Sequence, residues 1–294
     1  LRCAERHESD HSRNPKRLSD CVGPPLLRSG RRHDGLRNGI VIGLSSADVS
    51  LDSLSSTLGV SMQLPRLVTI AYALSMAATV GAQTFAFGLW GDMPYQKAND
   101  GPKMQALIDS INASDIAFSI FDGDIKDGSS KCTDDVYTDA LAMFAKFSRP
   151  TVYIPGDNEW TDCHRLNNGG YDNLERLAHV RYIMFPTPDT LGRTTMSVER
   201  QGKRGEKFVE NVRFVFEGIV FVGLNVPGSN NNRVLDAKDC ANKSARTPAQ
   251  CEADNAEYIE RDAANIQWMQ EAFAMARERK AAGLVIVFQA DPGF

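Results

Sequence analysis

Short apolar runs alternate with amphipathic segments along the middle of the chain. Residues 85–90, 115–121 and 151–154 are rich in aromatic, β-branched and other apolar side chains, which predicts three strands. Between them, residues 102–113 and 134–147 carry apolar side chains at helical spacing, which predicts two helices. Strands that alternate with helices indicate a parallel sheet with right-handed crossovers, so we expect an α/β fold.

The last third of the chain has a different pattern. Two β-rich runs, residues 208–216 and 219–226, are separated by a Glu-Gly pair, which predicts a hairpin. We expect a long helix over residues 253–281 and a buried strand over residues 284–288. The chain ends soon after that strand, so we expect the domain to be incomplete at its C-terminus.

The N-terminal part divides into two segments. Residues 1–61 show no steady apolar periodicity, so we expect disorder there, or an upstream segment that is not part of the native protein. Residues 62–82 begin with methionine and combine a basic start, an apolar run and small residues before Ala82, which predicts a signal peptide. A buried helix or an uncleaved anchor is the alternative, although the apolar run is shorter than the roughly 20 residues that span a bilayer. We therefore expect a secreted or periplasmic protein with a mature domain over residues 83–294.

The cysteine content agrees with export, and the net charge bears on possible partners. The formal net charge of the 294 residues is -4, which favours neither a nucleic-acid surface nor an anionic membrane as partner. The mature domain holds four cysteines, which permit two disulfides in three possible pairings, whereas no C-x-x-C spacing indicates zinc. In one pairing, a bond from Cys240 to Cys251 would close a polar loop, and a bond from Cys132 to Cys163 would connect two loops that follow strands.

Three carboxylates follow three successive predicted strands. Asp92, Asp124 and Asp157 each come directly after a glycine at the C-terminal end of a strand. In an open α/β sheet these ends face one edge, where ligands bind. Each Gly-Asp pair taken alone is typical of a turn or a helix cap. Three carboxylates that meet at one edge instead indicate a shared divalent cation, because carboxylate oxygens suit hard cations.

These positions belong to longer motifs. The chain resembles the calcineurin-like metallophosphoesterase family in three segments, Gly91-Asp92, Gly123-Asp124-Ile125-Lys126-Asp127-Gly128 and Pro155-Gly156-Asp157-Asn158-Glu159. The resemblance covers about residues 85–294. It implies a two-sheet α/β sandwich flanked by helices and a centre of two divalent metal ions that hydrolyses phosphoesters.

The resemblance also implies roles for individual residues. Asp92 would bind the first metal ion, Asp124 would bridge both, and Asp157 would stand in the place of the usual asparagine ligand. Asp127 and Glu159 would support these ligands from behind.

The family's histidines are missing. No histidine follows Asp92 in the first motif, and Asn158 stands where a histidine normally protonates the leaving group. Gln289 follows the last strand, where a histidine ligand is expected, and we place it in support of the ligands. The final G-H-x-H motif would lie beyond Phe294. Carboxylate and amide ligands favour manganese, magnesium or calcium over zinc or iron.

Other side chains could take part in the chemistry. His164 and Arg165 follow the third motif, so they could supply a catalytic imidazole and a guanidinium that binds phosphate, and Tyr95 could line the substrate cleft. The alternative for each is a loop residue exposed to solvent or packed against its neighbours. Asn158 is a catalytic candidate together with His164, because the asparagine amide can hydrogen-bond a phosphate oxygen.

The sequence thus leads to one main functional hypothesis and two rivals. The main hypothesis is an exported metal-dependent phosphoesterase that acts on a phosphorylated small molecule or lipid. The first rival is a non-catalytic relative that binds a metal or a phosphorylated ligand through the same fold. The second is a structural or interaction protein in which the aspartates only cap loops.

Overall fold

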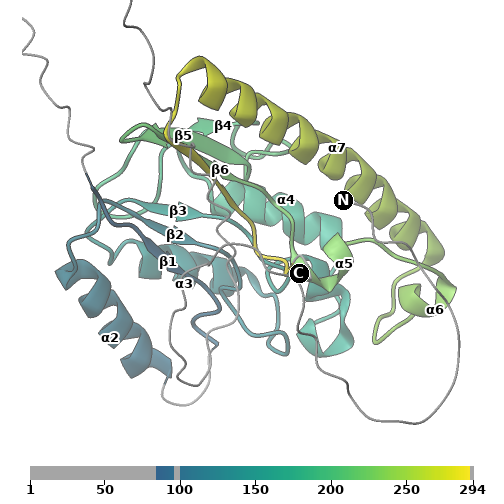
Figure 1. Ribbon diagram of the computed structural model, residues 1–294. Coiled ribbons are helices and arrows are strands. Elements are labelled where there is room, and N and C mark those ends of the chain that lie inside the picture. Colours follow the sequence, from purple (N-terminus) through teal and green to yellow (C-terminus); the bar gives the residue numbers. More distant parts are fainter. Residues whose placement is uncertain (1–83, 96–99, 292–294) are drawn as a thin grey trace, which may run out of the picture. The chain divides into compact units, whose positions relative to one another are not determined.

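The computed structural model describes residues 84–95 and 100–291. The predicted disordered segment and signal peptide lie outside the described residues, as does Phe294. The described chain is a mixed α/β fold with two sheets, one of three strands and one of four (Figure 1). The helices and strands run in the order β1 Gly88–Trp90, α2 Asp100–Ala113, β2 Ser119–Phe121, α3 Asp134–Phe144, β3 Thr151–Tyr153, η1 Thr161–His164, η2 Leu166–Asn168, α4 Asn173–Ile183, β4 Glu199–Arg200, β5 Val212–Phe216, β6 Ile219–Gly223, α5 Gly228–Asn231, α6 Ala237–Cys240, α7 Pro248–Glu278 and β7 Gly283–Val287.

The first sheet has the predicted parallel arrangement. Its strand order is β1-β2-β3, and residues at the strand ends, Trp90, Phe121 and Tyr153, are paired in register across the sheet. The three strands are shorter than predicted: β1 and β2 begin later, and β3 ends one residue earlier. The two crossover helices, α2 and α3, confirm the predicted alternation. Since the strands are parallel and in register, the loops that follow them emerge at one edge.

The second sheet is mixed, in the order β4-β5-β6-β7. The predicted hairpin is β5 and β6, and both residues of its turn have positive φ, 44° at Glu217 and 76° at Gly218. Such a two-residue turn matches the twist of the flanking strands. The helix α7 connects β6 to its parallel neighbour β7. It begins earlier than predicted, because Thr247 and Gln250 form a capping box around Pro248.

Three apolar layers hold the sheets and helices together. The two sheets face each other across a core of β-branched and aromatic side chains, among them Phe118, Val152, Phe214 and Phe221. The opposite face of the three-stranded sheet packs against α2, α3 and α4, and the opposite face of the four-stranded sheet packs against α7. The described residues therefore form a sandwich of two sheets with helices on both outer faces.

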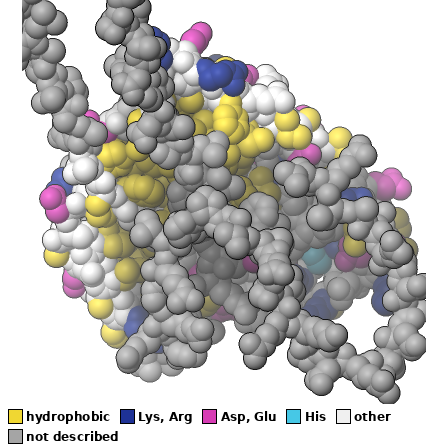
Figure 2. Space-filling model, in the orientation of Figure 1, with side chains coloured by type: hydrophobic (Ala, Val, Ile, Leu, Met, Phe, Trp, Pro, Cys, Tyr) yellow, Lys and Arg dark blue, Asp and Glu magenta, His cyan; other side chains and the backbone are white. Residues whose placement is uncertain are grey.

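One disulfide joins the segments that follow β2 and β3, and the other joins α6 to α7. Cys132 pairs with Cys163 and Cys240 with Cys251, which is the pairing described above. Figure 2 shows hydrophobic side chains gathered on the side of the two sheets that faces the viewer, with charged side chains around them. Within residues 84–95 and 100–291, no helix is both long and apolar enough to cross a membrane.

Candidate functional site

The three aspartates that follow the parallel strands line one cleft. Asp92 comes after β1, Asp124 after β2 and Asp157 after β3. The cleft has a volume of about 290 Å³. It is lined by Asp92, Asp124, Asp157, Asn158, Gly228, Gln289, Ala290 and Asp291. The strand ends and the loop after β7 therefore bring distant parts of the sequence to one place.

Left-handed backbone and glycines allow the close approach. Asp92 has φ of 57° and Asp124 has φ of 68°, a conformation that side-chain-bearing residues adopt rarely and that concentrates at functional sites. Gly123 has φ of 107°, and a Cβ atom there would lie 2.5 Å from the Cα of Gly156. A Cβ atom on Gly156 would in turn overlap the Asp124 carboxylate. Gly123 and Gly156, which precede Asp124 and Asp157, are thus required by packing between the ends of β2 and β3.

Gln289 connects two of the carboxylates. Its amide Nε2 donates to Oδ2 of Asp124 at 3.3 Å and to Oδ1 of Asp157 at 3.4 Å. Its Oε1 accepts from the backbone N of Gly228 at 2.6 Å, which fixes the orientation of the amide. The backbone N of Asn158 donates to the other oxygen of Asp124, at 3.2 Å. Gln289 and Asn158 therefore both lie at the cleft, where the sequence places them.

Glu159 supports the turn after β2 from within the core. It is fully buried, and its Oε1 accepts from the backbone N of Asp124 at 2.8 Å and of Ile125 at 3.2 Å. Its Oε2 has no hydrogen-bond partner among the described residues. Burial, more than any neighbouring charge, raises the pKa of Glu159 to about 7.

Asp127 lies in the loop beyond the cleft. It accepts hydrogen bonds from the backbone N atoms of Ser129 at 2.7 Å and Ser130 at 3.0 Å. This is a local turn, in which an aspartate caps the backbone that follows it. Its carboxylate is not among the groups that line the cleft.

Negative charge accumulates at the cleft. Burial and the repulsion of Glu159 and Asp157 raise the pKa of Asp124 to about 10. Burial is also the largest effect at Asp92, whose pKa is raised, although the Tyr95 hydroxyl donates to its Oδ1 and opposes the shift. Carboxylates crowded in this way take up protons unless a cation balances them.

Asp122 adds a further carboxylate that our sequence reasoning missed. It precedes Gly123 at the end of β2, it is buried, and its backbone N donates to the carbonyl of Trp90 on β1. Burial, with a smaller contribution from the charge of Asp92, raises the pKa of Asp122 to about 7. The signal was present in the sequence, since Asp122 and Asp124 flank the same glycine.

The donor groups of the cleft suit a hard divalent cation. Carboxylate and amide oxygens are the ligands that magnesium, manganese and calcium prefer, and the raised pKa of Asp124 indicates a need for positive charge. In the part of the chain that the structure describes, however, no three His, Cys, Asp or Glu side chains are placed to hold a metal ion together. Binding of a cation would therefore have to draw the carboxylates closer, or to use amide oxygens and water as further ligands.

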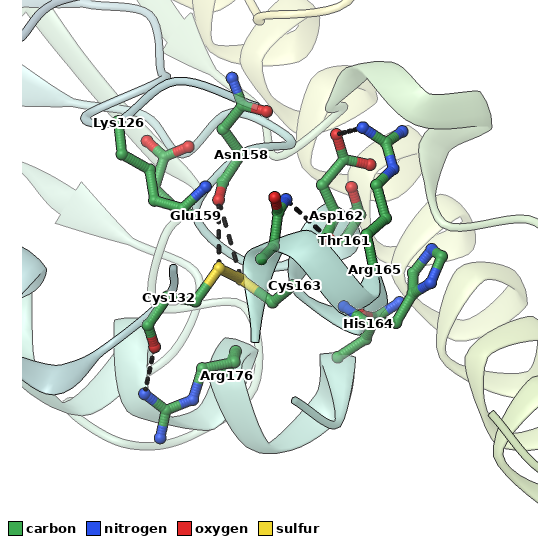
Figure 3. The surroundings of a disulfide bond; sticks show 12 residues. Lys126, Cys132, Asn158, Glu159, Thr161, Asp162, Cys163, His164, Arg165 and Arg176 are labelled. Carbon is green, nitrogen blue, oxygen red and sulfur yellow. Dashed lines mark hydrogen bonds and ion pairs between the residues drawn. A yellow bond between two sulfur atoms is a disulfide. The ribbon is translucent and has the colours of Figure 1, made fainter. Parts of the chain in front are cut away.

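His164 and Arg165 lie beside the cleft rather than in it. Both belong to the wall of a neighbouring pocket, and neither is among the residues that line the cleft. Figure 3 shows both side chains on the far side of η1 from the disulfide Cys132–Cys163. The backbone O of Asn158 lies close to this disulfide, 3.6 Å from the sulfur of Cys132.

A serine that the sequence did not indicate connects the cleft to the neighbouring pocket. Ser229 Oγ lies 2.7 Å from Oδ2 of Asp157 and 2.6 Å from Oδ1 of Asp162. Arg165 donates to the same hydroxyl at 3.2 Å and pairs with Asp162 at 2.5 Å. Ser229 begins a run of four residues with positive φ that ends at Asn232.

Comparison of the chain with protein-family models gave no match. Comparisons with curated proteins and with solved structures gave none either.

Proposed function

We propose that this protein is an exported metal-dependent phosphoesterase with its metal centre in the carboxylate cleft. The observation that carries the proposal is the convergence of Asp92, Asp124 and Asp157 from three strand ends into one cleft. Burial, followed by the negative charges of Glu159 and Asp157, raises the pKa of Asp124, and this supports a cation as a partner of the carboxylates. The two disulfides support a location in an oxidising compartment.

Each residue of the cleft would have its own role in this function. Asp92, Asp124 and Asp157 would hold the metal ions, with manganese, magnesium or calcium favoured, and Gln289 would keep Asp124 and Asp157 in place. The cations, when bound, would stabilise charge that develops on the phosphoryl group. Asn158 could donate a hydrogen bond to a phosphate oxygen, but its amide does not transfer a proton at neutral pH. We therefore expect activated phosphoesters, with good leaving groups, to be the better substrates among phosphorylated small molecules or lipids.

The rival function is binding without turnover. It is favoured by one observation: among the residues that line the cleft there is no histidine to protonate a leaving group. In that case the same carboxylates would hold a cation, and the cation would bind a phosphorylated ligand.

Two measurements on the full chain test these proposals. Metal content is measured after purification in the presence of manganese or magnesium, and hydrolysis of an activated aryl phosphate is measured with the same cations. We expect Asp124→Asn to lose both metal and hydrolysis, because it removes the central carboxylate without changing its shape. The exposed Asp139→Asn on α3 is the matched control and should keep both.

The outcomes separate the alternatives. Metal that is lost in Asp124→Asn, without hydrolysis in the wild type, indicates the binding function. Equal metal content in the wild type and in Asp124→Asn would overturn the metal centre, and equal hydrolysis would overturn the assignment of activity to this cleft.

A further inference from the structure

A second pocket lies next to the carboxylate cleft and has the opposite charge. Its volume is about 310 Å³, and its wall is formed by η1, α5 and the loops on either side of α6. Four cationic side chains and only two carboxylates line it, namely Arg165, Arg233, Lys243 and Arg246 against Asp162 and Asp239. The wall is otherwise mainly polar, with asparagine amides as further hydrogen-bond donors.

Two of the cations are fixed in the wall. Arg246 is nearly buried, with 8% of its side chain exposed, and its Nη1 pairs with Asp254 at 2.7 Å. Arg165 pairs with Asp162, which lines the pocket from the side of the carboxylate cleft. These pairs hold the guanidinium groups in position before any ligand arrives.

The other two cations are exposed at the pocket. Arg233 lies near the ring of Tyr258, with 5.9 Å from its guanidinium carbon to the ring centre, and Lys243 is exposed to solvent. Within the described residues, neither forms an ion pair with a carboxylate. Their charge is therefore available to an anion that enters the pocket.

Two buried nitrogen atoms of the wall also lack partners. Nδ1 of His164 and Nε of Arg246 have no hydrogen-bond partner among the described residues. Buried polar atoms in native proteins are nearly always hydrogen-bonded, so each such atom indicates a ligand, a water molecule or a functional role. Burial, followed by the positive charges of Arg246 and Arg165, lowers the pKa of His164 to about 4, which is consistent with a positive potential at this wall.

We propose that this pocket binds an oxyanion of the phosphate class. The cationic side chains supply charge-assisted hydrogen bonds, and the concave polar wall brings them to bear on one ligand. The oxyanion could be a free ion or an acidic group carried by the ligand of the carboxylate cleft. The second source rests on the proposed function; it is physically reasonable because Ser229 contacts both Asp157, in the cleft, and Asp162, in the pocket.

The test is titration calorimetry of the full chain with inorganic phosphate. It is run with EDTA, so that phosphate bound through a metal does not contribute, and repeated with manganese. We expect saturable binding with EDTA that weakens about tenfold in Arg233→Gln, because one charge-assisted contact is lost. The matched control is Arg149→Gln, an exposed arginine that is not among the pocket's lining residues, which should bind as the wild type does.

One further readout completes the test. The Nε–H resonance of Arg246, followed by NMR, should shift on addition of phosphate in the wild type. Absence of saturable binding with EDTA, or an equal loss of affinity in Arg149→Gln, would overturn the proposal. Because the titration with EDTA involves neither metal nor turnover, its result is independent of the phosphoesterase assignment.

The source of the oxyanion is found by kinetics. If it belongs to the substrate, an aryl phosphate with a second phosphate group should have a lower KM than the simple aryl phosphate, and Arg233→Gln should abolish the difference. Equal KM values, together with calorimetric binding, indicate a free oxyanion.

Discussion

Replacement of Gln289 by glutamate tests whether the cleft is built around a cation. The two side chains have nearly the same shape, so Gln289→Glu changes charge and hydrogen bonding with little change in packing. In the wild type, Nε2 of Gln289 donates to both Asp124 and Asp157. The substitution removes both donors and adds a carboxylate to a cleft that already holds three aspartates at strand ends.

The size of the effect follows from these contacts. A hydrogen bond to a neutral group contributes about 0.5–1.5 kcal/mol and one to a charged group about 1.5–3 kcal/mol, and the lower part of each range applies here because 3.3 and 3.4 Å are long distances. Without a cation Asp124 is protonated, because its pKa is raised to about 10. Loss of both bonds should therefore lower the free energy of unfolding by about 2 kcal/mol, and repulsion from Asp157 should lower it further. A cation at a hundred times its dissociation constant returns about 2.7 kcal/mol, and the added carboxylate should tighten its binding.

The assay is urea denaturation of the full chain with EDTA and with excess manganese or magnesium. We expect Gln289→Glu to be much less stable than the wild type with EDTA and to recover most of the loss when the cation is added. Gln289→Leu is the control, because it also removes the two donors but adds no charge; it should stay destabilised in both buffers. If the cation stabilises Gln289→Glu no more than Gln289→Leu, the carboxylates do not share a cation and the reasoning fails.

Other predictions concern the framework of the site. Burial opposes ionisation of Glu210, but the charge of Arg181 outweighs burial and lowers the pKa of Glu210. The pair therefore stabilises the fold at pH values above the ordinary pKa of a glutamate. This stabilisation is lost as the pH falls through the lowered pKa of Glu210. Arg181→Met should cost about 3–5 kcal/mol at pH 7 and less at acidic pH, where Glu210 is protonated; a loss in urea denaturation that does not change with pH would contradict this. Replacement of Cys132 and Cys163 by serine opens a loop with a sequence separation of 31 and should lower the free energy of unfolding by about 3–4 kcal/mol, whereas an unchanged urea midpoint would show that the disulfide is dispensable. Gly123→Ala should impair metal binding and lower the thermal midpoint, since φ is 107° there and the new methyl group would meet the end of β3; wild-type behaviour would refute that reading.

Much of the fold could be predicted from local patterns. The alternation of apolar runs with amphipathic segments was enough to place β1, β2 and β3 in a parallel sheet, and the Glu-Gly turn was enough to place the β5–β6 hairpin. The stretch around His179 was recognised as helix-like, but the bounds of α4 were not predicted, because its start depends on Asp172, whose side chain accepts from the backbone N atoms of Leu174 and Glu175. The strands β6 and β7 are separated by α7 in the sequence, so a local pattern could not predict that they pair in parallel.

The cleft and the pocket differ in how far the sequence could predict them. Parallel strands in register deliver the residues after their ends to one edge, so a local rule was enough to group Asp92, Asp124 and Asp157. The pocket is assembled from η1, α5 and the loops around α6, which have no common period or register. From the sequence, Arg165 was only a loop residue that could bind phosphate. In the structure, Arg165 forms an ion pair with Asp162 and donates a hydrogen bond to Ser229.

Ser229 connects the carboxylate cleft to the neighbouring pocket. A serine hydroxyl has one hydrogen, so it can donate to only one of the two carboxylates that it contacts, Asp157 at 2.7 Å or Asp162 at 2.6 Å. A cation that engages Asp157 in the cleft would leave the hydroxyl free to donate to Asp162 alone. That change would alter the hydrogen bonds around Arg165 in the pocket, because Arg165 contacts both Asp162 and Ser229. If the cleft binds a cation and the pocket an oxyanion, as proposed, the two binding events would be linked through one hydroxyl group, and by thermodynamic reciprocity each would change the affinity of the other by the same factor.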